Sequence, residues 1–306
     1  KKTMDKNYLY LAQKYGAEIL SENEVYDVRP TQTIDGANGY EIAIKTSTKF
    51  FTKRKTLKSK AVIFSGGVLG TIKLLLKLKT TSLPHISDRL GLDIRTNNET
   101  LVSVSSLEKN KNYSKGVAIG SILDTDENSH LEICRYSEGS NAWKLLHLPY
   151  VTGRNIFSRL AKVVVCLIKS PITYFKIYFV NRWAKKTVVL LFMQTLDSTL
   201  RFKRNSFGSM SSTVSTGKKP TPFIPESVKL IKEYSTAVNG VSTSFALETI
   251  AGIPSTAHVL GGAVMGESAS EGVIDKNNKV FGYNNLYIID GSMISDYIIN
   301  CPVHSK

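Results

Sequence analysis

The chain has 306 residues, 42% of them hydrophobic, and a formal net charge of +15. This length allows one large domain or two modest ones, and the apolar content excludes wholesale disorder. The lysines are spread along the chain, without an arginine-rich block or a basic patch interleaved with aromatic residues. We therefore interpret the charge as a solvated basic surface and expect no nucleic-acid partner.

The cysteines Cys134, Cys166 and Cys301 lie far apart in the sequence. They form neither a metal-binding pair nor a disulfide framework, so we expect no metal site and a reducing, cytoplasmic location. We expect no membrane-spanning helix, because the longest apolar stretch, 160–180, is interrupted by lysines and Pro171. The first residues do not form a signal peptide, and we expect this sequence to begin at an interior point of a longer protein.

The N-terminal part predicts a helix followed by short strands. We expect a helix over 8–15 that ends at Gly16, strands over 17–28, 40–46 and 50–58, and a turn over 35–39. A buried strand beginning at Lys60 then enters a turn with Gly66, Gly67 and Gly70, and a helix follows. A strand, turn and helix of this kind can present backbone N–H groups to a phosphate or a flavin edge.

The middle of the chain changes character twice. Residues 92–141 are strand-rich, and 155–183 are helical and basic with a break at Pro171. The helical segment is either a packed helix pair or a surface that contacts a membrane or caps an apolar cavity. The remaining predictions are strands over 186–202 and 208–213, a linker over 218–225 and a helix over 227–237.

His258 is the first candidate for chemistry. A histidine beside Val259 is by itself more often structural, but Gly261 and Gly262 follow within one turn and let a backbone or ligand approach closely. An imidazole is the usual acid, base or hydrogen-bond donor for alcohol chemistry near neutral pH.

Two further patterns stay open on local signals. The Gly66, Gly67 and Gly70 pattern is often helix–strand packing, and Asp290-Gly291, which closes an apolar run, is either a turn cap or a ligand contact. Glu132 lies on a predicted strand, where alternation puts it on one face with Cys134. From the residues alone, a surface glutamate or a partner for Arg135 is favoured over a carboxylate made basic by an apolar pocket.

Taken together, these stretches resemble the glucose–methanol–choline (GMC) oxidoreductase family, on its cholesterol-oxidase-like branch. The resemblance covers nearly the whole chain and is carried in order by 7–17, 60–71, 95–99, 132–141, 257–262 and 282–291. It implies a mixed α/β fold. In it, an incomplete FAD-binding α/β domain (1–91 and 255–306) accompanies a substrate-binding domain of β-sheet plus helices (92–254).

The resemblance also implies an activity and roles for residues. It implies hydride transfer from a bulky alcohol, sterol- or steroid-like, to FAD. His258 would orient the hydroxyl, and Glu132 would be the pocket carboxylate. Where relatives have Asn-Pro, this chain reads Asn300-Cys301-Pro302, so Asn300 or Cys301 would fill the second polar position. The residues implied to line FAD are Gly66, Gly67, Gly70, Asn97, Gly262, Asp290 and Gly291.

The family's opening Gly-x-Gly-x-x-Gly fingerprint does not occur in this sequence. Three hypotheses follow: a fragment of a full enzyme, which is favoured; one half of a two-chain enzyme; or a decayed protein. The corresponding alternative function is a non-catalytic lipid- or membrane-associated remnant that no longer binds FAD.

Overall fold

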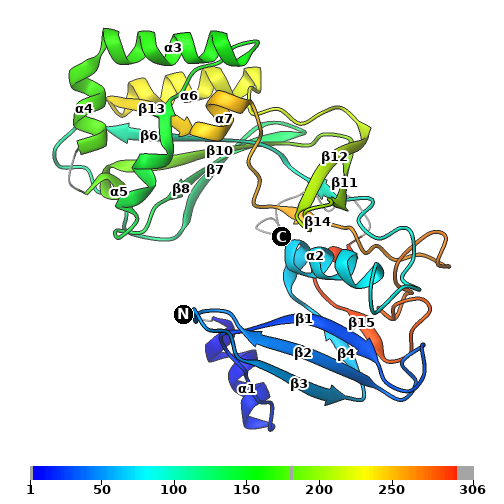
Figure 1. Cartoon of the computed structure of the whole chain (residues 1–306). Coiled ribbons are helices and arrows are strands. Elements are labelled where there is room, and N and C mark those ends of the chain that lie inside the picture. Colours follow the sequence, from blue (N-terminus) through cyan, green and yellow to red (C-terminus); the bar gives the residue numbers. More distant parts are fainter. Residues whose placement is uncertain (1–2, 180–181, 295–306) are drawn as a thin grey trace. The chain divides into compact units, whose positions relative to one another are not determined.

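The computed structural model describes residues 3–179 and 182–294 (Figure 1). Helices and strands are mixed along the chain, which confirms the predicted α/β class. The chain divides into two compact units. In the described residues, unit 1 comprises 3–93, 201–212 and 260–294, and unit 2 comprises 94–179, 182–200 and 213–259.

Unit 1 contains a three-stranded antiparallel sheet in the order β1-β2-β3 and a separate parallel pair of β4 with β15. Its helix α2 packs against β1 and η3 (Figure 1), and α1 buries none of its side chains. The elements of this unit are η1 (Met4–Lys6), α1 (Tyr8–Lys14), β1 (Asn23–Pro30), β2 (Tyr40–Thr46), β3 (Arg54–Ser59), β4 (Val62–Phe64), α2 (Gly67–Lys79), β15 (Leu286–Ile288) and η3 (Gly291–Met293).

Unit 2 is built on a six-stranded sheet in the order β7-β8-β10-β6-β13-β9. Its elements are β5 (Arg95–Thr96), β6 (Asn98–Ser106), β7 (Ile119–Asp126), β8 (Ser129–Arg135), η2 (Asn141–Leu146), β9 (His147–Pro149), α3 (Ile156–Lys169), α4 (Pro171–Phe179), α5 (Trp183–Lys186), β10 (Thr187–Gln194), α6 (Pro225–Ala237), β13 (Gly240–Phe245) and α7 (Ala246–Ala251). The strands β11 (Ser198–Arg204), β12 (Met210–Gly217) and β14 (Val259–Leu260) have residues in both units.

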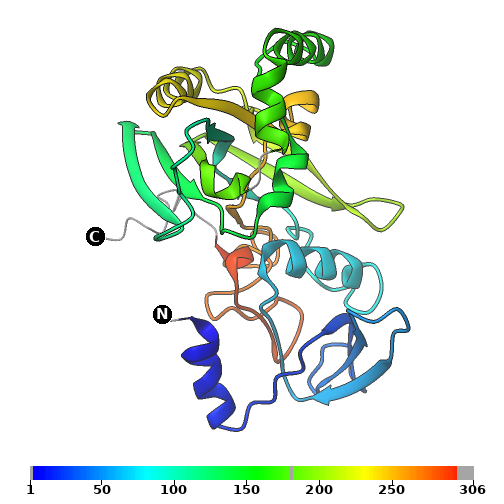
Figure 2. The same ribbon diagram turned by 90° about the vertical axis from the view of Figure 1, so that its left-hand side faces the viewer.

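Helices cover one face of the six-stranded sheet. α6 packs on β6 and β13, and α7 packs on β9 and β13; α3 lies outside α7 and contacts it (Figures 1 and 2). Side chains of a strand alternate between its faces, so every second residue of β6 and β10 points toward α6. The resulting core contains Val102, Val104, Leu131, Val188, Leu190, Phe192, Ile224 and Ile231.

Several predicted elements agree with the structure, and others need correction. The helix over 8–15, the strand over 40–46, the strand–turn–helix unit from Lys60 and the helix over 227–237 correspond to α1, β2, β4–α2 and α6. The strand predicted from Ala17 begins at Asn23, and that predicted from Phe50 begins at Arg54. The single strand predicted over 186–202 is two strands, because the chain leaves the ladder between Gln194 and Ser198.

Candidate functional site

The second face of the unit 2 sheet carries the candidate catalytic residues. Leu191 of β10 pairs with Leu101 of β6 and Glu132 of β8, and Met193 pairs with Glu99 and His130. Directly paired residues share a face, so Glu99 and Glu132 lie on the side away from α6, one on each strand beside β10. The ladder register therefore brings together two acidic residues that are distant in sequence.

Both glutamates on this face are buried, at 0% exposure for Glu99 and 1% for Glu132. Within the described part of the chain, neither carboxylate oxygen of Glu132 has a hydrogen-bond partner; His130 Nε2 lies 3.8 Å from its Oε1. A buried carboxylate without such partners is costly and usually marks a functional group. The structure thus corrects the interpretation of Glu132 as a surface glutamate or a partner for Arg135, whose guanidinium instead donates to backbone carbonyls.

His258 is held by the other glutamate of this face. Its Nδ1 lies 2.7 Å from Glu99 Oε1, and the same oxygen accepts the Thr256 hydroxyl at 2.8 Å. The His258 N–H donates to Thr256 Oγ1 at 3.1 Å, which closes a small ring of contacts. With its Nδ1 proton engaged by Glu99, a neutral His258 keeps its lone pair on Nε2.

The surroundings of His258 favour its charged form. The hydrogen bond to Glu99 raises the pKa of His258 above its usual value, burial opposes this, and the charges of Glu99 and Glu132 add to the increase. The charge of Glu132 therefore acts on the same imidazole that Glu99 holds. The ion pair stabilises the fold fully below about pH 6.5, and its contribution is lost as the pH rises through the raised pKa.

A third buried acid, Glu248 of α7, interacts electrostatically with Glu99. Its Oε1 accepts the Ser255 N–H at 3.1 Å, and its exposure is 2%. Burial raises the pKa of Glu248 to about 7, and the charge of Glu99 adds to the increase. Glu248 is therefore partly protonated near neutral pH, which reduces the repulsion between the two carboxyl groups.

The predicted cofactor residues of unit 1 gather at one edge of the parallel pair. β4 leads into Gly66, which caps α2, and β15 leads into Asp290 and Gly291. The carboxyl ends of parallel strands beside a helix N-terminus are where α/β sheets bind ligands. A Cβ added at Gly67 or Gly70 would meet nothing within 4 Å, so space is open beside both glycines.

The Asp290 carboxylate joins the two loops at this edge. Thr71 Oγ1 donates to Asp290 Oδ2 at 2.5 Å and accepts the Gly66 N–H at 3.1 Å. The other carboxylate oxygen accepts the N–H and the hydroxyl of Ser292. In the described residues Asp290 thus works as a cap and cross-link, one of the two interpretations that the sequence left open, and it fixes the positions of Gly66 and Gly291.

The glycine pair after His258 also has a backbone role. A Cβ at Gly261, whose φ is +84°, would lie 2.2 Å from the Asp93 carbonyl oxygen. The Gly262 carbonyl accepts the Gly91 N–H at 2.7 Å. Gly261 and Gly262 therefore allow close backbone approach within unit 1.

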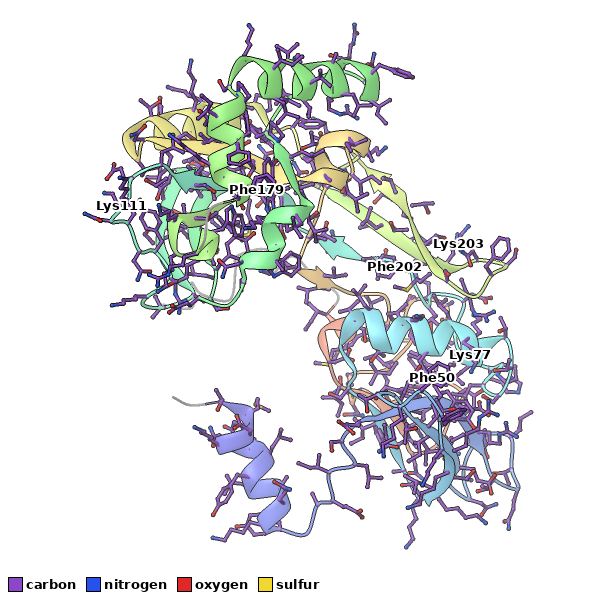
Figure 3. All side chains as sticks on the ribbon, turned by 60° about the vertical axis from the view of Figure 1, so that its left-hand side comes forward. Phe50, Lys77, Lys111, Phe179, Phe202 and Lys203 are labelled. Atoms are coloured by element: carbon purple, nitrogen blue, oxygen red, sulfur yellow. The ribbon has the colours of Figure 1, made fainter. Side chains whose placement is uncertain are left out.

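A cavity of about 710 Å3 lies in unit 1 beside the turn that joins β4 to α2. Gly66, Gly70 and Thr71 line it together with basic side chains, which are Lys45, Lys73, Lys77 and Arg204. Figure 3 labels Lys77 on α2. Open glycines, a helix N-terminus and cationic side chains are features that fit a phosphate-bearing cofactor.

The other predicted site residues are distributed differently. Asn97 belongs to unit 2, where its amide donates to Met193 Sδ at 3.0 Å. Asn300 and Cys301 lie outside the described residues. In the described ranges, no cluster of three or more His, Cys, Asp or Glu residues is arranged to hold a metal ion.

Sequence reasoning missed Glu99, Thr256 and Glu248 as site residues. Glu99 lies in the 95–99 stretch that carries the family resemblance, but the sequence alone indicates no role for it. A charged residue at the start of an otherwise apolar and small-residue strand is the available signal. Its meaning appears only once the pairing of β6, β10 and β8 is known.

Comparisons with known proteins agree with this picture. Residues 199–304 match the family model of the GMC oxidoreductases. The chain is 38% identical over 300 residues to a cholesterol oxidase of Acinetobacter baumannii, covering 96% of this chain and 54% of that protein. It is 32% identical over 307 residues to a cholesterol oxidase of Mycobacterium tuberculosis, covering 96% of this chain and 52% of that protein.

These matches are to oxidoreductases. They confirm the predicted resemblance to the GMC oxidoreductase family on its cholesterol-oxidase-like branch. The chain spans about half the length of the curated relatives that it matches.

Solved structures similar to this chain include two oxidoreductases. One is an FAD-dependent oxidoreductase from Chaetomium thermophilum, with a TM-score of 0.47, 15% identity, and coverage of 95% of this chain and 60% of that one. The other is a formate oxidase, with a TM-score of 0.47, 13% identity, and coverage of 89% and 56%.

Replacing Glu99 with Gln should lower the pKa of His258, because the charge and the strongest acceptor at Nδ1 are removed together. The measurement is the chemical shift of the His258 ring protons against pH by NMR. The matched control is Glu127→Gln, an exposed glutamate of the same unit, which should leave the titration unchanged. An unaltered His258 titration in Glu99→Gln would contradict this account of the pair.

Replacing Glu248 with Gln should change how stability depends on pH. A carboxyl whose pKa in the folded state is about 7 contributes stability below about pH 4.5, and this is lost as the pH rises through 7. The loss is on the order of 3 kcal/mol, and Glu248→Gln should remove it. Denaturant unfolding at pH 5 and pH 8 measures how much the free energy of unfolding changes between the two pH values. The exposed Glu226→Gln is the control. An equal change in Glu248→Gln and in the wild type would refute the assignment.

Proposed function

We propose that the polypeptide containing this chain is an FAD-dependent oxidoreductase that acts on the CH–OH group of a bulky, sterol- or steroid-like alcohol in lipid metabolism. One observation carries the proposal. The sheet register sets the buried Glu132, whose oxygens accept no hydrogen bond in the described residues, on the same face as Glu99, and Glu99 holds His258 by its Nδ1. A base of fixed tautomer and a buried carboxylate are what alcohol oxidation followed by double-bond migration requires.

His258 is proposed to bind the substrate hydroxyl and to take its proton. Glu99 keeps a proton on Nδ1, so the lone pair of neutral His258 is on Nε2 and can accept the hydroxyl proton. Glu99 is a positioning residue that acts through His258. The hydrogen bond and the charge of Glu99, which raise the pKa of His258, also stabilise the imidazolium that forms when the proton arrives.

Glu132 is proposed to move a proton on the oxidised product. A ketone acidifies the neighbouring carbon, and a carboxylate beside it can take that proton and return it further along, which shifts the double bond. Glu132 is buried, and among the described residues neither of its carboxylate oxygens accepts a hydrogen bond, which leaves both oxygens available to a bound product. Asn300 or Cys301 is proposed to supply the second polar contact beside His258.

The chain's own residues fit part of an FAD site. Gly66, Gly67, Gly70, Gly262, Asp290 and Gly291, with Asn97, are proposed to hold the cofactor through the open glycines and the N-terminus of α2. FAD, when bound, accepts the hydride that leaves the alcohol carbon. Unit 1 is proposed as the partial FAD-binding domain and unit 2 as the substrate-binding domain.

The location proposed is cytoplasmic, peripheral to a membrane. None of the helices in the described ranges has the length and apolar character needed to cross a bilayer. The competing proposal, a lipid-associated remnant without FAD, rests on the missing Gly-x-Gly-x-x-Gly fingerprint. Flavin binding separates the two proposals.

The natural polypeptide that contains these residues should retain FAD after gel filtration and show the flavin absorbance band. His258→Ala should lower its turnover of a 3-hydroxysteroid by about 10²–10⁴-fold while FAD stays bound, since proton transfer contributes that much. Steady-state kinetics and flavin absorbance measure the two effects. A colourless protein after reconstitution would favour the remnant, and unchanged turnover in His258→Ala would show that the histidine is structural.

Glu132→Gln should impair double-bond migration more than oxidation. The amide keeps the shape of the side chain and loses the base, so ketone formation continues while the unshifted ketone accumulates. Separate assays of the two product isomers by chromatography measure the split. Glu127→Gln is the control, and equal loss of both steps in Glu132→Gln would argue against a distinct base role.

A further inference from the structure

Helix α3 turns its apolar side away from its own unit. Its apolar residues recur at i, i+3, i+4, i+7, i+8 and i+11, which is one face of a helix. That face is exposed and consists of Phe157, Leu160, Ala161, Val164, Val165 and Ile168. Phe157 is 79% exposed and Ile168 is 72% exposed. An aromatic and aliphatic stripe of this kind normally faces a core or a partner.

The inward side of α3 is fixed by a buried arginine. Arg159 and Val163 are the buried residues of the helix. The Arg159 guanidinium donates to the carbonyls of Thr249, Ile250 and Gly153, at 2.7, 2.7 and 2.9 Å. These three bonds hold the helix in an orientation that leaves the apolar stripe outside.

Helix α4 extends the same kind of surface. Its Ile172, Phe175 and Phe179 recur at i, i+3 and i+7 and are 62–70% exposed. The rings of Phe175 and Phe179 stack with their centroids 4.6 Å apart, and Figure 3 labels Phe179 on α4. We call the exposed apolar residues of α3 and α4 together the α3–α4 face.

The stretch of sequence that contains α3 and α4 carries charge of one sign. From Gly139 to Leu196 the sequence has no Asp or Glu over 58 residues, whereas the chain average would put about five there. The same stretch has nine basic residues: Lys144, Arg154, Arg159, Lys162, Lys169, Lys176, Arg182, Lys185 and Lys186. Lys162, Lys169 and Lys176 are exposed on the two helices themselves.

We propose that the α3–α4 face docks the protein on an anionic lipid bilayer, with the two helices lying in the plane of the headgroups. Apolar residues on one face and lysines beside them match the chemistry of an interfacial helix. A second copy of this face would bring positive charge against positive charge, which disfavours self-association. The docking does not depend on the proposed enzyme activity.

Vesicle flotation of the 306-residue chain tests the proposal. The chain should float with vesicles of phosphatidylcholine plus phosphatidylserine, less with phosphatidylcholine alone, and less at high salt. The triple variant Phe157→Ser/Phe175→Ser/Phe179→Ser should bind at least ten-fold more weakly. The matched control replaces the exposed Phe50, Phe51 and Phe207 of unit 1 by Ser (84–96% exposed) and should bind as the wild type does.

Charge reversal provides the second arm. Lys162→Glu/Lys169→Glu/Lys176→Glu should also weaken binding at least ten-fold, whereas the same change at the exposed Lys53, Lys55 and Lys60 of unit 1 should weaken it less. Circular dichroism checks that the surface variants stay folded.

Three results would overturn the proposal. In the first, the control variants lose as much vesicle binding as the α3–α4 variants. In the second, the chain self-associates through this face and does not bind vesicles. In the third, a longer natural polypeptide does not bind vesicles, because its other residues cover the face.

Discussion

The hydrogen bond between Glu99 and His258 is the contact on which the candidate site depends. It joins the start of β6 to a segment that follows α7, across 159 positions of sequence. A fully buried carboxylate is tolerated because the imidazole and Thr256 share one of its oxygens. The contact with Glu99 fixes the tautomer and the direction of the His258 ring.

The two faces of the unit 2 sheet differ in role: one packs in the apolar core, and the other carries the candidate catalytic residues. Even-numbered residues of β6 and β10 form the apolar core under α6, and the register sends Glu99 and Glu132 to the other side. A shift of one residue in β6 or β8 would exchange the faces of that strand and put Glu99 or Glu132 under α6. The core packing that stabilises the sheet therefore also fixes where the acids lie.

Local elements with strong patterns could be predicted from sequence, and long-range partners could not. The strand and helix around Gly66 and the helix over 227–237 were predicted because apolar periodicity and glycines are local signals. The role of Glu99 was missed, because it depends on which strands pair. Residues 17–22 were assigned to a strand although their backbone finds no ladder partner before Asn23, and the predicted strand over 186–202 is two because β-propensity does not show where a ladder ends.

The orientation of α3 shows why amphipathicity alone does not assign a helix to a core. Its apolar spacing would suit a helix packed on the sheet, but the apolar stripe of α3 is exposed. Arg159 fixes this orientation, because its guanidinium donates to three backbone carbonyls and would lose them if the helix turned about its axis. A turned helix would leave these carbonyls without the donor that satisfies them here, and an unsatisfied buried carbonyl is costly. One buried cation thus keeps an apolar stripe in solvent.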